Sequence, residues 1–488
     1  MAADAITTTN TATNVAKGIA EKYKLLDEID HVLQRPAMYL GQVKPRESEE
    51  WLPDGGSFRR ELVTFSPALL KIYDEIVTNS VDEHKRNPKL DKIDITVTPT
   101  TITVRDNGGI PVQEHPTHKV LVPELIFSNL RAGSNFDDTE DRVVAGTHGL
   151  GSTLSNIFSL RFSVETADGK KRFHQEFTNN LRKRTKPSVI GSPKRYTEIS
   201  FDPDISRFDL QDIDRVHLEL MKKRAIDLAA CNPGLAITFN GERFKFAGFK
   251  AYCERYAPAV TCESSDRWQV GVGTSADGPC QVSFCNGAET KDGGTHVNSI
   301  SQQVVAAIRE MLLKKHKVDV KPSDVRSHLF FFVNCSVRNP SFSTQTKERL
   351  ITDAKDFGGV HSVSQKLIKA VFESEAIASI LDWVKQKSEA DERAQLRKLN
   401  RDLGKGRVEK LVDAKGSDRS KCVLGIFEGG SAVSPVRKFR DPQRFGAFPL
   451  KGKFLNVMEM KPSEVAKNQE ATDLMASLGL RMGEPPDS

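Results

Sequence analysis

The sequence predicts a mixed α/β protein built from several successive domains. Its length of 488 residues corresponds to about three domains of ordinary size. Hydrophobic residues make up 38% and charged residues 28% of the chain, which is typical of folded proteins and excludes a largely disordered one. Segments with the 3.6-residue spacing of helices alternate with runs of β-branched residues, which is the pattern of sheets covered by helices.

The order of these segments predicts an arm, three domains and a linker. Residues 1–21 are small and polar and are expected to form a flexible amino-terminal arm. A first α/β domain is expected over residues 22–235 and a second over residues 236–390. A linker over residues 391–420 and a smaller domain over residues 421–488 would follow.

A helix expected at residues 69–84 carries the most informative pattern of the first domain. Its apolar residues recur at helical spacing, which predicts packing on a sheet, while Glu75, Asn79 and Asp82 lie on its other face. Alternating β-branched runs predict strands after it, and a Gly-rich segment precedes a further helix. The later elements of this domain are expected at residues 93–98 and 101–105 (strands), 152–158 (helix), and 160–165 and 197–201 (strands).

The second and third domains show the same mixture of patterns. A long helix is expected between two strands of the second domain, and a protruding helix at its end. An apolar run at residues 422–427 predicts a short buried strand at the start of the third domain. The elements expected in the second domain are strands at residues 268–272, 281–286 and 329–336, a helix at 295–315 and a helical region at 373–402.

The chain contains no P-loop motif of the form GxxxxGKS or GxxxxGKT, which argues against a Walker-type nucleotide hydrolase. Residues 146–151 (GTHGLG) instead lead into the helix expected at residues 152–158. Backbone N–H groups and the positive end of a helix can bind a polyphosphate at such a place. A single Gly-rich stretch is more often a plain flexible loop, so this signal alone leaves both interpretations open.

Several weak signals follow one another in a particular order. A helix with Glu75 and Asn79 is followed by Asp106 with a glycine two residues later, then by the Gly-rich residues 146–151, and then by Thr197 at the start of a strand. This succession resembles the GHKL ATPases, which include gyrase, MutL, Hsp90 and the histidine kinases. The resemblance implies a GHKL (Bergerat) ATPase sandwich that binds ATP and Mg²⁺.

Three longer strings indicate the branch of this family. They are similar to strings of the type II DNA topoisomerases, in the style of eukaryotic and T-even bacteriophage enzymes rather than of bacterial gyrase. The resemblance covers about residues 22–480 and implies that the second domain is a transducer domain with a ribosomal S5-like fold. The strings are residues 35–41 (RPAMYLG), 293–298 (GGTHVN) and 339–348 (NPSFSTQTKE).

The resemblance also implies roles for individual residues of an ATP site. Glu75 would be the general base that orients and deprotonates the attacking water, a role that a carboxylate can fill. Asn79 would be a neutral oxygen ligand of Mg²⁺. Asp106 would accept a hydrogen bond from the adenine amino group, and Thr197 would support the adenine ring. The alternatives are that Glu75 is a solvated acid on the helix face, that Asn79 is a capping or surface amide, and that Asp106 is an ordinary turn residue. Further nucleotide contacts are expected at Asp82, Gly108, Gly146, His148, Gly149, Leu150, Gly151 and Gln345.

Lys347 belongs to the second domain, yet it resembles the lysine that reaches across to the γ-phosphate in this family, with Gln345 beside it. A cation there stabilises charge during phosphoryl transfer. Because the lysine belongs to the second domain, its contact with the γ-phosphate would also signal to that domain that ATP is bound. Lys347 is therefore expected to be both a catalytic residue and a sensor, and an ordinary surface lysine is the alternative.

Residues 428–432 (EGGSA) follow an apolar run and resemble the EGDSA motif of the TOPRIM fold, and residues 449–457 (PLKGKFLNV) resemble the string that follows that motif. Glu428 would then be the acid that holds Mg²⁺ for DNA cleavage and religation. Such a site needs several carboxylates around the ion. The acids after Glu428 form no DxDxD cluster, and Gly430 stands where the motif usually has Asp, so a partial TOPRIM domain is expected.

The cleavage nucleophile of a type II topoisomerase is a tyrosine, and the six tyrosines of this chain end at Tyr256. A degenerate gene is one explanation. The resemblance to T-even bacteriophage enzymes implies another, a split enzyme whose partner subunits carry the rest of TOPRIM and the catalytic tyrosine. Glu428 would then form half of a composite Mg²⁺ site.

The resulting hypothesis is an ATPase subunit of a type II DNA topoisomerase, an isomerase. It would bind duplex DNA, form a homodimer through its amino-terminal ATPase domain, and gate the passage of one duplex through a double-strand break in another. The alternative is a stand-alone GHKL clamp, MutL-like or Hsp90-like, which would have no reason to carry Glu428. Basic runs would line a DNA path or be ordinary solvated faces. These runs are residues 182–184, 314–317 and 397–398.

The sequence also indicates where in the cell the protein is expected. No run approaches the roughly 20 apolar residues of a membrane span, and residues 1–14 lack the pattern of a signal peptide. The net charge of +6 permits a nucleic-acid partner without requiring one. We therefore expect a cytoplasmic protein with no membrane partner, in the host cytoplasm if a phage encodes it.

Overall fold

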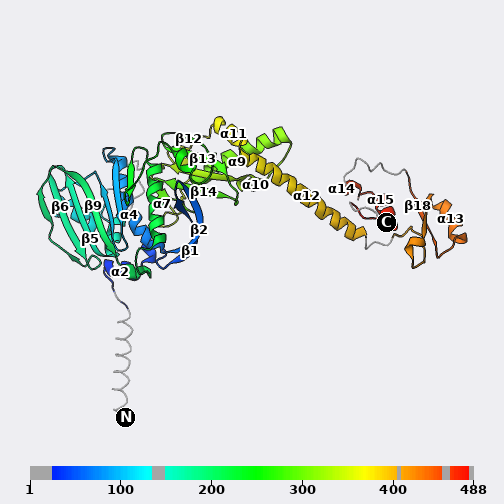
Figure 1. Cartoon of the computed structure of the whole chain (residues 1–488), viewed down its shortest axis with the longest axis horizontal. Coiled ribbons are helices and arrows are strands. Elements are labelled where there is room, and N and C mark those ends of the chain that lie inside the picture. The colour runs from blue at the N-terminus through cyan, green and yellow to red at the C-terminus, as the bar shows by residue number, and fades with distance from the viewer. Residues whose placement is uncertain are drawn as a thin grey trace, which may run out of the picture. The chain divides into compact units, whose positions relative to one another are not determined.

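The computed structural model describes residues 23, 25–133, 149–403, 408–452, 462–465 and 467–482. The predicted phosphate-loop residues Gly146 and His148 lie outside the described residues, as do residues 453–457 of the predicted TOPRIM string. The chain divides into two compact units, Met1–Ile377 and Ala378–Ser488. Figure 1 shows the elements of each unit.

The first unit contains a nine-stranded sheet with a layer of helices against one face (Figure 1). The strands are β3 (Lys92–Val97), β4 (Ile102–Asp106), β5 (Ser159–Asp168), β6 (Lys171–Thr178), β7 (Lys183–Arg184), β8 (Ser188–Gly191), β9 (Arg195–Pro203), β10 (Ala236–Phe239) and β11 (Glu242–Phe244). Their order is β11-β10-β3-β4-β9-β5-β6-β7, with β8 paired to β6. Helices α4 (Pro67–Arg86), α6 (Gly151–Ile157) and α7 (Arg215–Cys231) share one hydrophobic core with this sheet.

Helix α4 carries much of the predicted site, and its sequence explains its bounds. Ser66 caps the first turn by accepting a hydrogen bond from the backbone N–H of Leu69. Pro67 takes the first helical position, where a missing N–H is tolerated. Three basic residues in the last turn complement the helix dipole. The structure confirms the helix predicted at residues 69–84.

The strands predicted at residues 93–98 and 101–105 form the antiparallel hairpin β3–β4. Strand β9 pairs antiparallel with both β4 and β5, and β10 pairs parallel with β3. Because β10 and β11 extend the sheet through Phe244, the boundary predicted at residue 235 lies inside this sheet rather than at its end. The pairing of β10 with β3 joins segments far apart in the chain, which local sequence patterns do not reveal.

Shorter elements surround this core. The hairpin of β1 (Arg46–Asp54) and β2 (Ser57–Phe65) is a separate antiparallel sheet that contacts α7. The short helices in this part of the first unit are α2 (Glu28–Gln34), α3 (Ala37–Leu40), α5 (Val122–Ser128), η1 (Ile205–Phe208) and α8 (Phe249–Cys253).

A five-stranded sheet completes the first unit. Its elements are β12 (Thr261–Ser264), β13 (Trp268–Thr274), β14 (Cys280–Cys285), β15 (Ala288–Glu289), β16 (Leu329–Cys335), α9 (Thr295–His316), α10 (Pro322–Arg326), η2 (Ala354–Asp356) and α11 (Gln365–Phe372). The strand order is β12-β13-β16-β14-β15, and α9 contacts β16, α10 and α11. These elements confirm the strands and the long helix predicted for the second domain.

Helix α12 (Glu375–Leu403) confirms the helical region predicted at residues 373–402. In the second unit, β17 (Val423–Glu428) and β18 (Phe445–Leu450) pair in parallel, and α13 (Gly430–Phe439) contacts both. The prediction that the first of these strands is buried is wrong, since Val423 is 55% and Ile426 47% exposed. In the part of the chain that the structure describes, only one helix, α13, packs on this two-stranded sheet to a comparable extent. Much of the strand surface is therefore exposed to solvent. The remaining elements are η3 (Arg419–Lys421), α14 (Pro462–Val465) and α15 (Gln469–Ser477).

Candidate functional site

A cavity of about 560 Å³ lies between the nine-stranded sheet, α4 and a loop that follows β16. Its volume falls in the usual range of sites for small ligands and cofactors. We refer to it as the sheet-side cavity. Most of the predicted site residues that the structure describes line it. They are Glu75, Asn79, Asp106, Gly149, Leu150, Gly151, Thr197, Gln345 and Lys347.

Two described residues of the predicted ATP site, Asp82 and Gly108, are not part of this lining. Asp82 is buried on α4, and its Oδ1 lies 3.6 Å from Nζ of Lys85. The backbone N–H of Gly108 donates a 2.8 Å hydrogen bond to Oδ1 of Asp106. Gly108 therefore acts on the cavity through the orientation of Asp106.

Asp106 ends β4 at the cavity wall, where hydrogen bonds hold both of its carboxylate oxygens. Besides the bond from Gly108, Ser80 Oγ donates to Oδ2 at 2.7 Å. Burial raises the pKa of Asp106, and these hydrogen bonds oppose that rise. The result is a fixed acceptor in a mainly apolar wall. Sequence reasoning missed this contact of Ser80.

Thr197 lies opposite Asp106 in the pairing of β4 with β9. Its hydroxyl oxygen is 3.0 Å from that of Thr166, which also accepts a 2.9 Å hydrogen bond from the backbone N–H of Ile110. The segment after Asp106 is thereby fixed to the sheet. Apart from Leu150, sequence reasoning assigned no apolar side chain to this site, although alternation along the strands could have suggested some. The apolar residues of the wall include Ile76, Ile110, Ile126, Phe127 and Ile199.

Glu75 is buried on α4 rather than solvated. Its Oε1 lies 2.6 Å from Nζ of Lys71, one helical turn earlier. Its Oε2 approaches the first residue of α6 so closely that a Cβ on Gly151 would lie 1.9 Å from it. Asn79, one turn after Glu75, is exposed and lines the same cavity. A buried carboxylate and an accessible amide thus share one wall. Sequence reasoning missed Lys71, although its spacing to Glu75 was visible.

The strings at residues 293–298 and 339–348 meet in the structure. Backbone hydrogen bonds of 3.1 Å join Leu350 to the residues on both sides of Gly294. Gly294 has a φ of +142°, and a Cβ there would lie 2.3 Å from the carbonyl oxygen of Leu350. Only glycine fits this crossing. The start of α9 therefore anchors the end of the loop that carries Gln345 and Lys347.

Lys347 lies in this loop with a φ of +64°, a left-handed conformation that is uncommon for residues other than glycine. Its side chain is buried. Burial lowers the pKa of Lys347, although the charge of Glu75 opposes the shift. Lys347 and Gln345 bring side chains from the region of the second sheet to a cavity formed mainly by the first.

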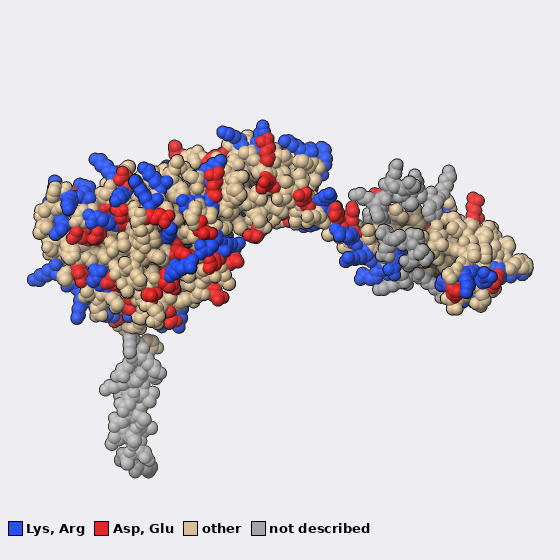
Figure 2. All heavy atoms as spheres, in the orientation of Figure 1, with Lys and Arg blue, Asp and Glu red and all other residues tan. Residues whose placement is uncertain are grey.

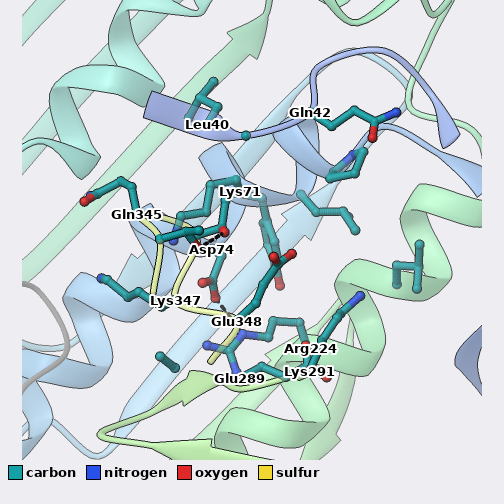
Figure 3. A pocket seen from close by; sticks show the side chains of 18 of the residues that line it. Leu40, Gln42, Lys71, Asp74, Arg224, Glu289, Lys291, Gln345, Lys347 and Glu348 are labelled. Carbon is teal, nitrogen blue, oxygen red and sulfur yellow. Dashed lines mark hydrogen bonds and ion pairs between the residues drawn. The ribbon is translucent and has the colours of Figure 1, made fainter. Parts of the chain in front are cut away.

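The same loop also lines a second cavity, of about 480 Å³ (Figure 3). We refer to it as the helix-side cavity. Gln345 and Lys347 line both cavities, so the loop forms a wall between them. Met38 and Gly41, from the string at residues 35–41, also line the helix-side cavity. All three strings that indicated the family branch therefore meet around this loop.

Polar contacts join α4 and α7 to the turn between β14 and β15. Lys85 Nζ donates to the carbonyl of Asn286 at 2.8 Å, and Arg224 Nη2 donates to the carbonyl of Gly287 at 2.6 Å. Arg224 also forms a 2.6 Å ion pair with Asp74 on α4. Helix α4 is therefore connected to the second sheet through charged side chains.

Glu428 is exposed at the carboxyl end of β17 in the second unit. Within the described ranges, no group of three or more His, Cys, Asp or Glu side chains is arranged to hold a metal ion. The described residues thus place no second and third acidic ligand beside Glu428.

The predicted basic runs contain ion-paired side chains. Arg182 pairs with Asp30, and Lys314 pairs with Glu310. Figure 2 shows basic and acidic side chains interspersed over the face of the first unit that it presents. These runs alone do not make that face uniformly positive.

Comparison with known proteins identifies the family. The family profile described as DNA gyrase B matches residues 248–399. The crystal structure of the ATPase and transducer domains of DNA topoisomerase II from Balamuthia mandrillaris is similar, with a TM-score of 0.72 and 37% identity over 76% of this chain and 99% of that one. The chain belongs to the type II DNA topoisomerase family. The ATPase region of Saccharomyces cerevisiae topoisomerase II is also similar, with a TM-score of 0.71 and 33% identity over 74% of this chain and 99% of that one.

The similarity to type II topoisomerases extends along nearly the whole chain. The probable DNA topoisomerase 2 of Dictyostelium discoideum is 38% identical over 507 aligned positions, which cover 97% of this chain and 33% of that protein. The chain thus spans about a third of the length of the curated topoisomerases that it matches. These matches confirm the predicted family, and the similarity to solved ATPase and transducer domains confirms the predicted fold class. They support the topoisomerase hypothesis and not the stand-alone clamp. No described helix is both long and apolar enough to cross a membrane.

Proposed function

We propose that this chain is the ATP-hydrolysing part of a type II DNA topoisomerase and uses ATP to gate the passage of one DNA duplex through a double-strand break in another. The observation that carries the proposal is a single cavity lined by Glu75 and Asp106 from the first sheet and its helices and by Lys347 from the region of the second sheet. A ligand that fills this cavity contacts both parts at once.

ATP is the substrate that these groups fit. Asp106, held by Ser80 and Gly108, would accept a hydrogen bond from the adenine amino group. The apolar side chains of the wall would contact the faces of the base, and Thr197 would support its edge. Residues 149–151, at the start of α6, would direct backbone N–H groups toward the phosphates.

Hydrolysis needs a base for the attacking water and positive charge at the γ-phosphate. Glu75 would accept a proton from the water as its oxygen bonds to phosphorus and the bond to the leaving ADP oxygen breaks. A positioned base typically contributes about 10²–10⁴-fold to the rate. Lys347 would stabilise the negative charge of the transferred group, with Gln345 beside it.

Magnesium fits the phosphate end of the cavity, because Asn79 offers an accessible amide oxygen one turn from Glu75. Asn79 would be the protein ligand, since Lys71 already contacts the Glu75 carboxylate. When bound, the ion neutralises phosphate charge and orients the β- and γ-phosphates.

Lys347 would couple ATP to movement. Because hydrolysis removes the γ-phosphate from Lys347, the two parts of the first unit hold different contacts before and after the reaction. The contacts of Lys85 and Arg224 with the β14–β15 turn support a mechanical connection between them. ATP binding would close a homodimer of the amino-terminal ATPase domains around DNA, and hydrolysis would reset it.

The second unit would take part in DNA cleavage. The β17–α13–β18 arrangement, with Glu428 at the end of its first strand, supports a partial TOPRIM domain. The described residues supply neither the remaining carboxylates around Glu428 nor a cleavage tyrosine near it. The proposal assigns them to partner subunits, as the resemblance to T-even bacteriophage enzymes implies, and Glu428 would complete their Mg²⁺ site.

The experiment that tests the proposal is Mg²⁺-dependent ATP hydrolysis by the purified chain, with and without duplex DNA, compared with Glu75→Ala. The expected result is hydrolysis that DNA stimulates in the wild type, and lost turnover with retained nucleotide binding in the variant. A wild type without ATPase activity, or a variant as active as the wild type, would contradict the assigned site.

A further inference from the structure

Gly41 and Thr346 meet in the lining of the helix-side cavity. A Cβ added to Gly41 would lie 2.9 Å from Cγ2 of Thr346. Carbon atoms that are not bonded to each other pack best at about 3.5–4.0 Å, so the threonine methyl group already fills this space. Figure 3 labels Leu40 and Gln42, on either side of Gly41 in the chain, and Lys347, which follows Thr346. A contact between the end of α3 and the loop thus lies next to the proposed catalytic lysine.

The end of α3 is held firmly on its own side of this contact. Leu40, the last residue of α3, is fully buried in the core of the first unit. The backbone N–H of Gly41 donates a 3.2 Å hydrogen bond to the carbonyl of Ala37. The carbonyl of Val43 accepts a 2.5 Å hydrogen bond from the hydroxyl of Ser66, which caps α4. A side chain added at Gly41 would therefore push the loop rather than α3.

The base of the loop is also fixed. The backbone N–H of Ser343 donates a 3.0 Å hydrogen bond to the carbonyl of Arg349. The carbonyl of Glu348 accepts a 2.9 Å hydrogen bond from the backbone N–H of Asp292. Residues 344–347 form the tip of the loop between these bonds, so a displacement that begins there would fall mainly on the tip itself.

The tip connects the threonine methyl group to the backbone of the lysine. The hydroxyl oxygens of Thr344 and Thr346 are 2.7 Å apart. The backbone N–H of Lys347 donates a 3.1 Å hydrogen bond to the carbonyl of Thr344. Lys347 directly follows Thr346 and holds a φ of +64°, which is uncommon for a lysine. A shift of Thr346 would therefore change the backbone that directs the Lys347 side chain.

We infer that Gly41 is a positioning residue for Lys347 and acts through Thr346. Because Gly41 has no side chain, the tip of the loop can lie against the end of α3, and Lys347 then lines the sheet-side cavity. The inference rests on the proposed function, in which Lys347 stabilises the γ-phosphate during transfer. A catalytic group displaced by about 1 Å can lose about 10²-fold in rate.

Backbone conformation alone would also favour a glycine at this position. Gly41 follows α3 with a φ of +73°, which residues with a side chain rarely adopt. Gly55 also has a positive φ, of +57°, but a Cβ there meets nothing within 4 Å. Comparison of the two alanine variants therefore separates the contact with Thr346 from backbone strain.

The test compares steady-state ATP hydrolysis by the full chain with that of Gly41→Ala. The expected result is a fall in kcat of about tenfold or more, with KM for ATP changed by less than about threefold, because Lys347 would act mainly in the transition state. Addition of Thr346→Ser, which removes the methyl group and keeps the hydroxyl, should restore most of the lost kcat. Gly55→Ala is the matched control and should keep wild-type kcat.

Combination with Lys347→Met shows whether Gly41 acts through the lysine. If it does, Gly41→Ala should lower the kcat of Lys347→Met by less than about twofold, because residues that act as one unit are not additive. Full multiplication of the two losses would overturn the inference. Wild-type kcat in Gly41→Ala, an equal loss in Gly55→Ala, or no recovery with Thr346→Ser would do the same.

Thr346→Leu tests the contact from the loop side if Gly41→Ala does not fold, since it enlarges the side chain and leaves the glycine unchanged. It should also lower kcat, and wild-type kcat in this variant would reject the inference. Thermal unfolding without nucleotide verifies that each variant is folded. Lys347→Met alone separates the two proposals: if it keeps wild-type kcat, the proposed role of Lys347 itself fails.

Discussion

Ser80 and Asp106 are joined by a 2.7 Å hydrogen bond in which the serine hydroxyl donates to Oδ2 of the carboxylate. The bond connects α4 to the end of β4, so the helix of the proposed base and the strand of the proposed adenine acceptor are fixed to each other. Because burial raises the pKa of Asp106, this bond also helps to keep the carboxylate ionised.

Ser80→Ala is therefore expected to weaken ATP binding. Loss of a hydrogen bond to a charged group should raise the Kd for ATP about tenfold, which corresponds to about 1.4 kcal/mol. The pKa of Asp106 should rise further, so ATP binding by the variant should fail at a higher pH than in the wild type as the solution is acidified. Calorimetric titration with ATP at several pH values measures both effects. Thr103→Val, which loses a 3.0 Å contact with Ser200 on the same sheet, is the control and should bind ATP normally.

Gly151→Ala is expected to abolish most ATP turnover while the chain still folds. A Cβ at this position would lie 1.9 Å from Oε2 of Glu75, so the carboxylate must move. Displacing a general base should lower kcat by about 10²-fold or more. Gly191→Ala is the matched control, because a Cβ there meets nothing within 4 Å. Wild-type kcat in Gly151→Ala would show that the carboxylate does not act from this position.

Lys347→Met should lower kcat without lowering the stability of the nucleotide-free protein. A catalytic cation at the transferred phosphate contributes about 10²–10³-fold, so a loss of this order is expected. The folded pKa of Lys347 is lowered by burial below its ordinary value of 10.5, so the buried charge costs stability at neutral pH. Removing that charge relieves the cost. Chemical denaturation without nucleotide and ATPase assays on the same samples test both statements.

The lowered pKa of Lys347 should also change how the stability of the protein depends on pH in alkaline solution. Between the lowered folded pKa and 10.5, the unfolded chain binds a proton at Lys347 that the folded chain does not, so the wild type gains stability as pH rises through this window. Lys347→Met lacks this gain. If the two proteins respond identically to rising pH, the lysine is not buried as described.

Local sequence patterns were sufficient to predict the elements that position the site. The stripe of α4 and the β3–β4 hairpin depend on residue spacing, and both were found where expected. The Asp106 position follows from them, since it ends the second strand of that hairpin.

Contacts between distant segments could not be predicted in this way. The pairing of β10 with β3, which moves the end of the first sheet to Phe244, depends on tertiary packing. The bond between Ser80 and Asp106 joins a helix to a strand, and neither residue signals the other in the sequence. Lys71 is a different case, because its i,i+4 spacing to Glu75 is visible, but only burial shows that the pair is not an ordinary surface contact.

Burial of His296 is expected to make the stability of the folded chain sensitive to acid. His296 is buried at the start of α9, and its Nε2 lies 3.1 Å from the hydroxyl of Thr290. Burial lowers the pKa of His296 from 6.5 to about 3. As pH falls below 6.5, the unfolded chain takes up a proton at this residue that the folded chain does not. The stability contributed by neutral His296 is therefore complete above pH 6.5 and is lost as the pH approaches about 3.

The expected loss from this residue is about 2 kcal/mol of unfolding free energy between pH 6.5 and about pH 5. His296→Gln cannot titrate in this range, so it should lose less stability on acidification, even if its free energy of unfolding at neutral pH is lower. Urea denaturation of both proteins at the two pH values gives the difference, in which the carboxylates common to both cancel. Equal acid sensitivity of the variant and the wild type would mean that His296 is protonated in the folded state, and that its environment is more polar than its burial indicates.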